Sequence, residues 1–437
     1  MRLDDLSLWF LGDPASPRLV GALRLVSAGK GVSLRYAPEW LASGFALSED
    51  LPLADIEHLP PGRLSADAQR AVGAVDDARP DRWGEKVIRF VDKPLRLSLM
   101  EYLYYAGDER FGALGVSTSP TVYNPRPGGP LPRFDEAQQL SEVVAKIEGS
   151  EAISELEARI VRTGGSLGGA KPKALIDIGG EPWVIKFFNG EPVDSPLVEH
   201  ATMTLAGRTG ITVARTQLIR LAGANAIAVR RFDREAGRRI HAISAGTAIR
   251  AAAASGGEPE LGYPELARVL RRIGLTQDDT YQRDARELFR RMVFNILVDN
   301  TDDHEKNHAL LVMNPFDNGR LKLAPAYDLL PTNSGQGYQE FICGAQGRDS
   351  TLANAMSQCE AFGLTPGEAA AEVGAVIAVV NGWKTHFAEA GVTARDIESL
   401  AEHIDGEALR GQREAFDAAA QRSAPSRRKP TSPFRRG

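Results

Sequence analysis

The sequence has little cysteine and no long hydrophobic run. Only Cys343 and Cys359 occur among 437 residues. Two cysteines are too few for a disulfide framework or a cysteine zinc site, so we expect both in the core of a protein from a reducing compartment. No apolar run approaches the roughly 18 residues of a membrane span, and the N-terminus has no signal-peptide core. The sequence therefore predicts a cytoplasmic protein without a membrane segment.

What is present is typical of a globular protein. The length is sufficient for two or three domains, with 43% hydrophobic and 25% charged residues. Six of the 52 basic residues and none of the acidic ones lie in 422–437, so residues 1–421 carry a formal charge of −11. An acidic body is not expected to bind nucleic acid directly. The basic tail is predicted to be disordered, either simply solvated or as an arm that contacts phosphate.

Residues 298–308 carry the strongest chemical pattern in the chain. Asp302 and Asn307 stand five positions apart, and Asp328 follows a short apolar run. Phosphoryl transfer in kinases uses an Asp that accepts the proton of the attacking hydroxyl, and an Asn five residues later that binds one Mg²⁺. A further Asp, at the start of the next segment, binds the other Mg²⁺. The spacing therefore favours a kinase catalytic loop.

The same stretch also fits a zinc motif. Residues 304–308 satisfy H-E-x-x-H, which on a helix would place His304 and His308 on one face for Zn²⁺. That arrangement requires a helix, whereas 300–303 is rich in short polar side chains that favour loops. A solvated polar turn is a third alternative.

Residues 163–173 contain a glycine-rich loop followed by a strand. Glycine lets backbone N–H groups approach an anion, and Lys171 and Lys173 add positive charge, as in loops that bind phosphate. The pattern is neither a Walker A motif nor a Rossmann fingerprint. A flexible loop before a strand explains it equally well.

Lys186 lies inside an apolar strand, the second of a predicted hairpin over 174–188. Burying a lysine is costly unless it is paired. A helix over 196–209, with Ser195 as its N-cap, would carry Glu199 in its first turn. A strand lysine and a helical glutamate form the ion pair that holds nucleotide phosphates in kinases. Alternatively, the lysine reaches the surface and the glutamate only complements the helix dipole.

The chain is predicted to have a β-rich half followed by a helical half. Short apolar runs between glycine and proline are typical of strands, and apolar residues at helical spacing are typical of amphipathic helices. Strands are expected at 6–11, 20–26, 32–36, 174–178, 182–188, 213–221, 226–231 and 309–313, and helices at 38–42, 66–75, 81–90, 135–161, 196–209, 263–273, 283–298, 366–387 and 394–412.

Five ordered motifs resemble the HipA family of bacterial serine/threonine protein kinases, the toxins of HipA–HipB modules. They are 166–173 (SLGGAKPK), 183–187 (WVIKF), 231–234 (RFDR), 300–307 (NTDDHEKN) and 324–329 (APAYDL). Residues 36–43, 51–53 and 77–82 are similar to the N-terminal subdomain of that family, so the resemblance covers roughly residues 1–410.

The fold that this resemblance implies is α+β and two-lobed, like a protein kinase. A β-rich N-terminal lobe with an extra N-terminal subdomain would precede a mostly helical C-terminal lobe. The predicted domains are 1–119 for the subdomain, 134–235 for the N-lobe, 236–421 for the C-lobe and 422–437 for the tail.

The resemblance also implies a role for each site residue. Asp302 would be the catalytic base, and Asn307 and Asp328 would bind Mg²⁺. Of the other catalytic residues, Lys186 would bind the ATP phosphates, and His304 would lie close to the nucleotide or in the catalytic loop. Ser166 occupies the place of a serine that these kinases autophosphorylate, and a phosphate there would repel ATP. The implied ATP-binding residues are Gly165, Ser166, Gly168, Gly169, Ala170, Lys173, Lys186, Glu199, Arg230, Phe232 and His304, with Arg230 and Phe232 at the hinge.

The implied function is ATP-dependent phosphorylation of a protein of translation, such as an aminoacyl-tRNA synthetase. A HipB-like antitoxin is the expected partner, and DNA is expected to be met only through it. Two alternatives belong to other classes. One is a non-catalytic corepressor that acts with a HipB-like protein on operator DNA. The other is a zinc hydrolase that uses His304 and His308.

Overall fold

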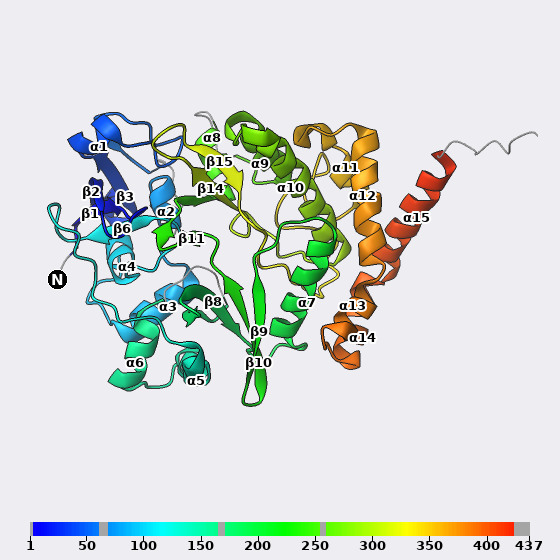
Figure 1. The fold of residues 1–437 in the computed structure, drawn as a ribbon, viewed down its shortest axis with the longest axis horizontal. Helices are drawn as coiled ribbons and strands as arrows, with labels where there is room; N and C mark the ends of the chain where they lie inside the picture. The colour runs from blue at the N-terminus through cyan, green and yellow to red at the C-terminus, as the bar shows by residue number, and fades with distance from the viewer. Residues whose placement is uncertain (1–2, 61–68, 165–170, 254–258, 424–437) are drawn as a thin grey trace, which may run out of the picture.

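A sheet at one end of the molecule and a layer of helices at the other enclose a second sheet (Figure 1). The structure, a computed structural model, describes residues 3–60, 69–164, 171–253 and 259–423. Within these ranges we find no helix with both the length and the apolar character that a bilayer crossing requires.

The N-terminal unit, residues 3–117, is built on a mostly antiparallel sheet. Its strand order is β4-β3-β2-β1-β6, and β5 joins β3 in parallel. The strands expected at 6–11, 20–26 and 32–36 are confirmed. The elements of this unit are β1 (Asp5–Phe10), β2 (Arg18–Val26), β3 (Gly31–Tyr36), α1 (Pro38–Ser43), β4 (Glu57–His58), β5 (Arg70–Ala71), α2 (Ala74–Asp77), α3 (Arg82–Val91), α4 (Leu99–Tyr105) and β6 (Leu114–Ser117).

The predicted helix over 66–75 is wrong where the structure describes it. The backbone N–H groups of Arg70 and Val72 each donate to a carbonyl in or just before β3, at 3.1 Å, so this segment joins the sheet. Gly73 follows with a φ of 45°, which no helix interior accommodates, and α2 begins only after it. Residues 66–68 lie outside the described ranges.

The second sheet has the order β7-β8-β10-β9 and is antiparallel throughout. The predicted hairpin is confirmed: Gly179 and Gly180 have φ values of 67° and 84°, as a primed two-residue turn requires. The elements around this sheet are α5 (Ala137–Glu148), α6 (Glu155–Arg162), β7 (Lys173–Ile178), β8 (Glu181–Phe187), α7 (Ser195–Arg208), β9 (Thr216–Leu221) and β10 (Ala224–Arg230).

Two predicted helix boundaries here differ from the structure. The stretch 135–161 forms two helices, because Ser154 starts α6 with its own capping box. The N-cap of α7 is Asp194, not Ser195, since the Asp194 carboxylate accepts the Leu197 N–H at 3.2 Å. A carboxylate at this position also complements the helix dipole.

The C-terminal part is mostly helical. The helix predicted over 263–273 is confirmed with the same bounds, and the one over 283–298 begins three residues earlier than expected. The elements are β11 (Arg234–Glu235), β12 (Arg238–Arg239), β13 (Ala242–Ser244), α8 (Ala245–Ala252), α9 (Tyr263–Ile273), α10 (Thr280–Leu297), β14 (Ala309–Met313), β15 (Arg320–Leu323), α11 (Leu352–Met356), α12 (Pro366–Val380), α13 (Trp383–Glu389), α14 (Ala394–Ile404) and α15 (Glu407–Ser423).

The last two predicted helices, 366–387 and 394–412, are each two helices. They divide near Gly382 and Gly406, where the low helix propensity of glycine allows the chain to turn. The helix α15 extends two residues into the predicted tail 422–437, and the rest of that tail lies outside the described residues.

One buried core runs from the N-terminal sheet into the helices. Leu34 of β3, Val198 of α7 and Phe289 of α10 all belong to it. Cys343 and Cys359 are buried and unpaired by disulfide, as expected. A second core lies under β7, β8 and β10 and includes side chains of α3, so the N-terminal unit packs against both following parts.

His241 joins the N-terminal unit to the C-terminal sheet. Its Nε2–H donates to the Leu47 carbonyl at 2.9 Å, and its ring packs against Phe45. Burial lowers the pKa of His241 from 6.5 to about 4, so the folded protein keeps this imidazole neutral.

This burial predicts a loss of stability in acid. Between pH 6.5 and about pH 4 the unfolded chain binds a proton that the folded protein does not. The free energy of unfolding is therefore highest above pH 6.5. It falls by up to about 3 kcal/mol as the pH drops from 6.5 to about 4. His241→Gln, which replaces the imidazole N–H donor with an amide N–H that does not titrate, should reduce the pH dependence of the unfolding free energy in urea denaturation series. An unchanged pH dependence would contradict the assignment.

Candidate active site

Lys186 lies between two carboxylates. Its Nζ is 2.7 Å from Glu199 Oε1 and 2.5 Å from Asp328 Oδ1. The strand β8 turns Trp183, Ile185 and Phe187 into the second core, so the lysine, at an intervening position, faces the other side. The predicted pair of Lys186 and Glu199 is thus present, and the alternative that the lysine reaches the surface is wrong.

The charges around Lys186 fix its ionisation. Burial alone lowers the pKa of Lys186, but the carboxylates of Asp328 and Glu199 outweigh burial and raise the pKa well above 10.5. Burial raises the pKa of Asp328, but the Lys186 and Lys173 ammonium groups hold it well below 3.8. Both partners are therefore charged at neutral pH, which leaves the Asp328 carboxylate able to bind a cation.

Lys173 stands opposite Lys186 in the pairing of β7 with β8. Burial lowers the pKa of Lys173, and the neighbouring Lys186 charge lowers it further. The rest of the predicted phosphate loop, Gly165, Ser166, Gly168, Gly169 and Ala170, lies outside the described residues.

The candidate catalytic loop follows α10 and is held by hydrogen bonds. The Asp299 carboxylate accepts the N–H groups of Ser334 and Gly335 at 3.0 and 3.1 Å. The Asn307 side chain donates to the Asp302 carbonyl at 3.4 Å, so the loop closes on itself. These contacts bring the two predicted loop residues together and leave the Asp302 side chain exposed.

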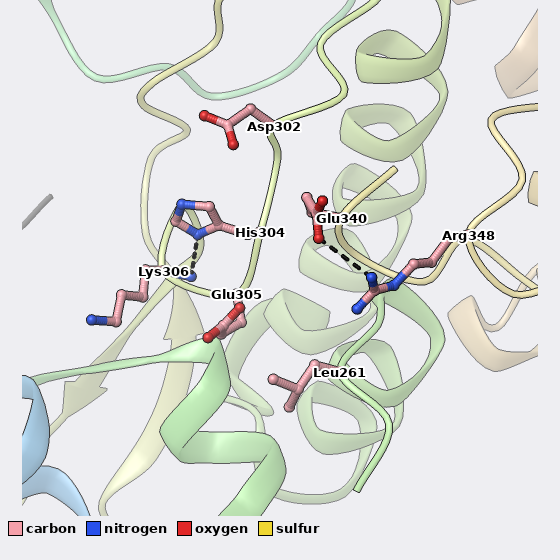
Figure 2. Close-up of a pocket in the computed structure, with 7 residues that line it drawn as sticks. All are labelled: Leu261, Asp302, His304, Glu305, Lys306, Glu340 and Arg348. Atoms are coloured by element: carbon pink, nitrogen blue, oxygen red, sulfur yellow. Dashed lines mark hydrogen bonds and ion pairs between the residues drawn. The ribbon is translucent and has the colours of Figure 1, made fainter. Parts of the chain in front are cut away.

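Asp302 opens onto a cavity of about 370 Å³ (Figure 2). Although Asp302 is exposed on the cavity side, the residues around it partly desolvate its carboxylate and raise its pKa, and His304 opposes this shift. Across the cavity, Glu340 and Arg348 form an ion pair of 3.4 Å. The lining residues are Leu261, Asp302, His304, Glu305, Lys306, Glu340 and Arg348.

The alternative zinc site is wrong on geometry. Residues 301–308 form turns and not a helix, so the motif does not present both imidazoles on one face. His304 Nδ1 accepts the Lys306 N–H at 3.1 Å, whereas His308 is buried and bonded to Asp303. Within the described residues there is also no group of three or more His, Cys, Asp or Glu side chains that could hold a metal ion.

A buried polar network connects the catalytic loop to α9 and α10, and the sequence did not predict it. Asp303 accepts hydrogen bonds from His308, at 2.8 Å, and from the Tyr263 hydroxyl. Asn295 donates to the same hydroxyl at 2.9 Å and accepts from Asn300 at 3.0 Å. Asp302 and Asp303 are adjacent, yet Asp302 is exposed and Asp303 is buried. The difference arises because Tyr263 and His308 pack around Asp303.

Replacing Asp303 with asparagine should destabilise the protein. His308 and the Tyr263 hydroxyl both donate to one oxygen of Asp303, Oδ2, and the substitution removes its charge. The new NH2 group would be buried where Oδ1 has no hydrogen-bond partner among the described residues, and a buried group left without a partner costs about 1–3 kcal/mol. Chemical denaturation should show this loss, while Asp317→Asn, at an exposed position, should cost almost nothing. Equal stability of the two variants would show that the network contributes little.

The predicted hinge residues contact the neighbouring segments. Phe232 packs on Tyr327, with ring centroids 5.3 Å apart, next to Asp328. Arg230 forms an ion pair with Glu181 across the sheet. Both side chains thus lie beside the elements that carry Lys186 and Asp328, and their role as a hinge for a nucleotide stays a prediction.

The residues on either side of Phe232 bind the N-terminal unit. Arg231 donates to the Arg110 carbonyl at 2.7 Å and to Asp233 at 2.7 and 2.9 Å. Asp233 also accepts the Gly112 N–H at 2.8 Å. Burial raises the pKa of Asp233, but the two neighbouring arginines hold it well below 3.8. The motif 231–234 therefore connects the end of β10 to the N-terminal unit.

Comparisons with known proteins agree with this architecture. A family model described as the HipA-like C-terminal domain matches residues 165–383, and one described as the HipA N-terminal domain matches residues 15–117. The chain is 30% identical over 165 residues to "Putative kinase Y4dM" of Sinorhizobium fredii (strain NBRC 101917 / NGR234). That match covers 35% of this chain and 38% of the relative, less than two fifths of either protein.

A solved structure has the same fold over nearly the whole length. It is a chain of the Shewanella oneidensis MR-1 toxin–antitoxin complex of HipA, HipB and its operator DNA. The TM-score is 0.63 at 17% identity, and the match covers 95% of this chain and 99% of that chain. This likeness confirms the predicted two-lobed, kinase-like α+β fold. The C-terminal model alone matches half of the sequence, so the chain belongs to the HipA family.

Proposed function

We propose that the protein is an ATP- and Mg²⁺-dependent serine/threonine protein kinase. The observation that carries this proposal is the double ion pair of Lys186 with Glu199 and Asp328. A lysine held in this way, beside a loop with Asp302 and Asn307, is the arrangement that kinases use to hold nucleotide phosphates and metal.

The residues present suit Mg²⁺ better than Zn²⁺. Asp328 offers an ionised carboxylate and Asn307 an amide oxygen, and Mg²⁺ prefers oxygen ligands from few protein groups together with substrate phosphates. Asp328 has a left-handed φ of 60°, an uncommon conformation that is concentrated at functional sites. Bound Mg²⁺ would neutralise the charge that develops on the transferred phosphoryl group.

The chain's own residues then have distinct tasks. Lys186 holds the nucleotide phosphates, while Glu199 keeps its side chain in place. Asp302 orients the acceptor hydroxyl and takes up its proton at a carboxylate oxygen. This role requires an ionised Asp302, because only a carboxylate can take up the proton; desolvation raises the pKa of Asp302, and the nearby His304 opposes that shift.

The cavity at Asp302 is the proposed place for the acceptor segment of a protein substrate. Its charged lining fits a polypeptide better than an apolar small molecule. The family resemblance suggests a protein of translation, such as an aminoacyl-tRNA synthetase, as the substrate. Ser166 is the proposed site of autophosphorylation, and a HipB-like DNA-binding antitoxin is the proposed partner, since the solved relative is a chain of a complex with HipB and operator DNA.

Asp328→Asn tests the proposed metal site. Asparagine tolerates the left-handed backbone but lacks the charge, so we expect binding of a non-hydrolysable ATP analogue to lose its dependence on Mg²⁺. Calorimetric titrations with and without Mg²⁺ would measure this. Equal Mg²⁺ dependence in both proteins would exclude Asp328 as a ligand.

The non-catalytic corepressor remains the alternative. It predicts binding of a HipB-like protein without any transfer of phosphate. A wild-type protein that binds no Mg²⁺-ATP under the same calorimetric conditions would favour it over the kinase.

A further inference from the structure

The start of α3, in the N-terminal unit, lies between the two parts that form the candidate site. Trp83 Nε1–H donates to the Lys173 carbonyl at 2.6 Å, on the strand that follows the glycine-rich segment. On the other side, Asp81 forms an ion pair with Lys306 of the catalytic loop. Two residues of one helix end therefore contact both sides of the site.

Asp81 is placed as a helix cap but does not act as one. It occupies the N-cap position of α3, yet its side chain makes no capping hydrogen bond to the helix. Aspartate at this position usually accepts a backbone N–H of the first turn, which stabilises the helix. The Asp81 carboxylate forms an ion pair with Lys306.

Lys306 lies between Asp302 and Asn307 in the catalytic loop and makes three contacts that fix its position. Its N–H donates to His304 Nδ1 at 3.1 Å, and its carbonyl accepts the Tyr327 hydroxyl at 2.7 Å. Its ammonium group binds Asp81. Since Tyr327 precedes Asp328, this one residue connects the catalytic loop, the segment of the second proposed metal ligand and the N-terminal unit.

We propose that Asp81 is a positioning residue for phosphoryl transfer, supplied to the catalytic loop by the N-terminal unit through Lys306. This inference rests on the proposed kinase function. In this proposal Asp81 acts on the reacting atoms only through Lys306. It holds the backbone that carries Asp302 and Asn307, and Trp83 holds the phosphate-binding strand relative to the same helix. The N-terminal unit is therefore part of the catalytic apparatus and not only an appended domain.

Asp81→Asn should lower kcat with little change in the KM for ATP. A displacement of about 1 Å in a catalytic group can cost about 100-fold in rate, so we expect a loss of about 10- to 100-fold. Asp81→Glu, which retains the charge, should recover part of the rate. Turnover of Mg²⁺-ATP by the full-length protein and thermal unfolding would be measured on the same preparations.

The double variant Asp81→Asn/Lys306→Gln decides whether the two residues act together. If Asp81 acts through Lys306, the double variant should be no slower than Lys306→Gln alone. Lys86→Gln is the matched control, because it breaks another ion pair of α3, with Glu148 at 3.1 Å, away from the catalytic loop. It should keep the wild-type kcat.

Losses that add in the double variant, or an Asp81→Asn protein with the kcat of the wild type, would overturn the proposal. So would an equal loss in Lys86→Gln, since the effect would then be general destabilisation. These outcomes differ from a failure of the kinase function, in which the wild type itself would transfer no phosphate.

Discussion

Replacing Asp302 with asparagine should lower kcat by about 10² to 10⁴, the range that general acid–base groups contribute. The amide has nearly the same shape but cannot take up the proton of the acceptor hydroxyl. The side chain is exposed and faces the cavity, so the fold should not change. The measurement is steady-state phosphoryl transfer from Mg²⁺-ATP, with thermal unfolding on the same samples.

Asp317→Asn provides the control for this substitution. It makes the same chemical change at an exposed position on the turn between β14 and β15. Its kcat and unfolding temperature should equal those of the wild type. Asp302 would lose its role as base if Asp302→Asn kept near-normal turnover, or if its loss of activity followed a loss of folded protein.

Lys186→Met should remove turnover and also destabilise the fold. The substitution leaves Glu199 buried without its cation, beside the second carboxylate of Asp328. Removing one partner of a buried pair costs about 3–5 kcal/mol, because the remaining charge is uncompensated. The pKa of Asp328, which Lys186 now lowers, should rise. Urea denaturation gives the stability, and Mg²⁺-ATP turnover gives the activity.

A variant of an exposed ion pair of similar length shows how much of the loss of stability is due to burial. Lys384 binds Asp405 at 2.7 Å, but its side chain is 52% exposed. Lys384→Met should therefore cost no more than about 1 kcal/mol and leave turnover unchanged. Similar losses of stability in the two variants would mean that the Lys186 site is not specially sensitive.

Local chemistry explains why much of this site could be predicted. The alternation of apolar residues around Lys186 marks a strand with one unusual position, and the helix-start signals before Glu199 lie within a few residues. The spacing of Asp302 and Asn307 is also local. These features can be recognised in the sequence because each depends on residues close to it along the chain.

The parts that could not be predicted depend on distant residues. Asp303 is buried only because Tyr263 and His308 surround it, and nothing next to it in the chain indicates that. The sequence around Asp81 predicts the start of a helix, and α3 does begin there. The contact of Asp81 with Lys306 could not be predicted, because the two residues are 225 positions apart. The wrong helix over 66–75 has the same origin, since pairing with β3 overrides a local helical pattern.

Intact-mass spectrometry of dephosphorylated protein, before and after incubation with Mg²⁺-ATP, tests the kinase assignment most directly. A kinase that uses Asp302 as its base should gain one phosphate, located on Ser166, in the wild type and none in Asp302→Asn. The same incubation with labelled ATP and a lysate would reveal protein substrates. Absence of transfer both to the protein itself and to every lysate protein would contradict the account.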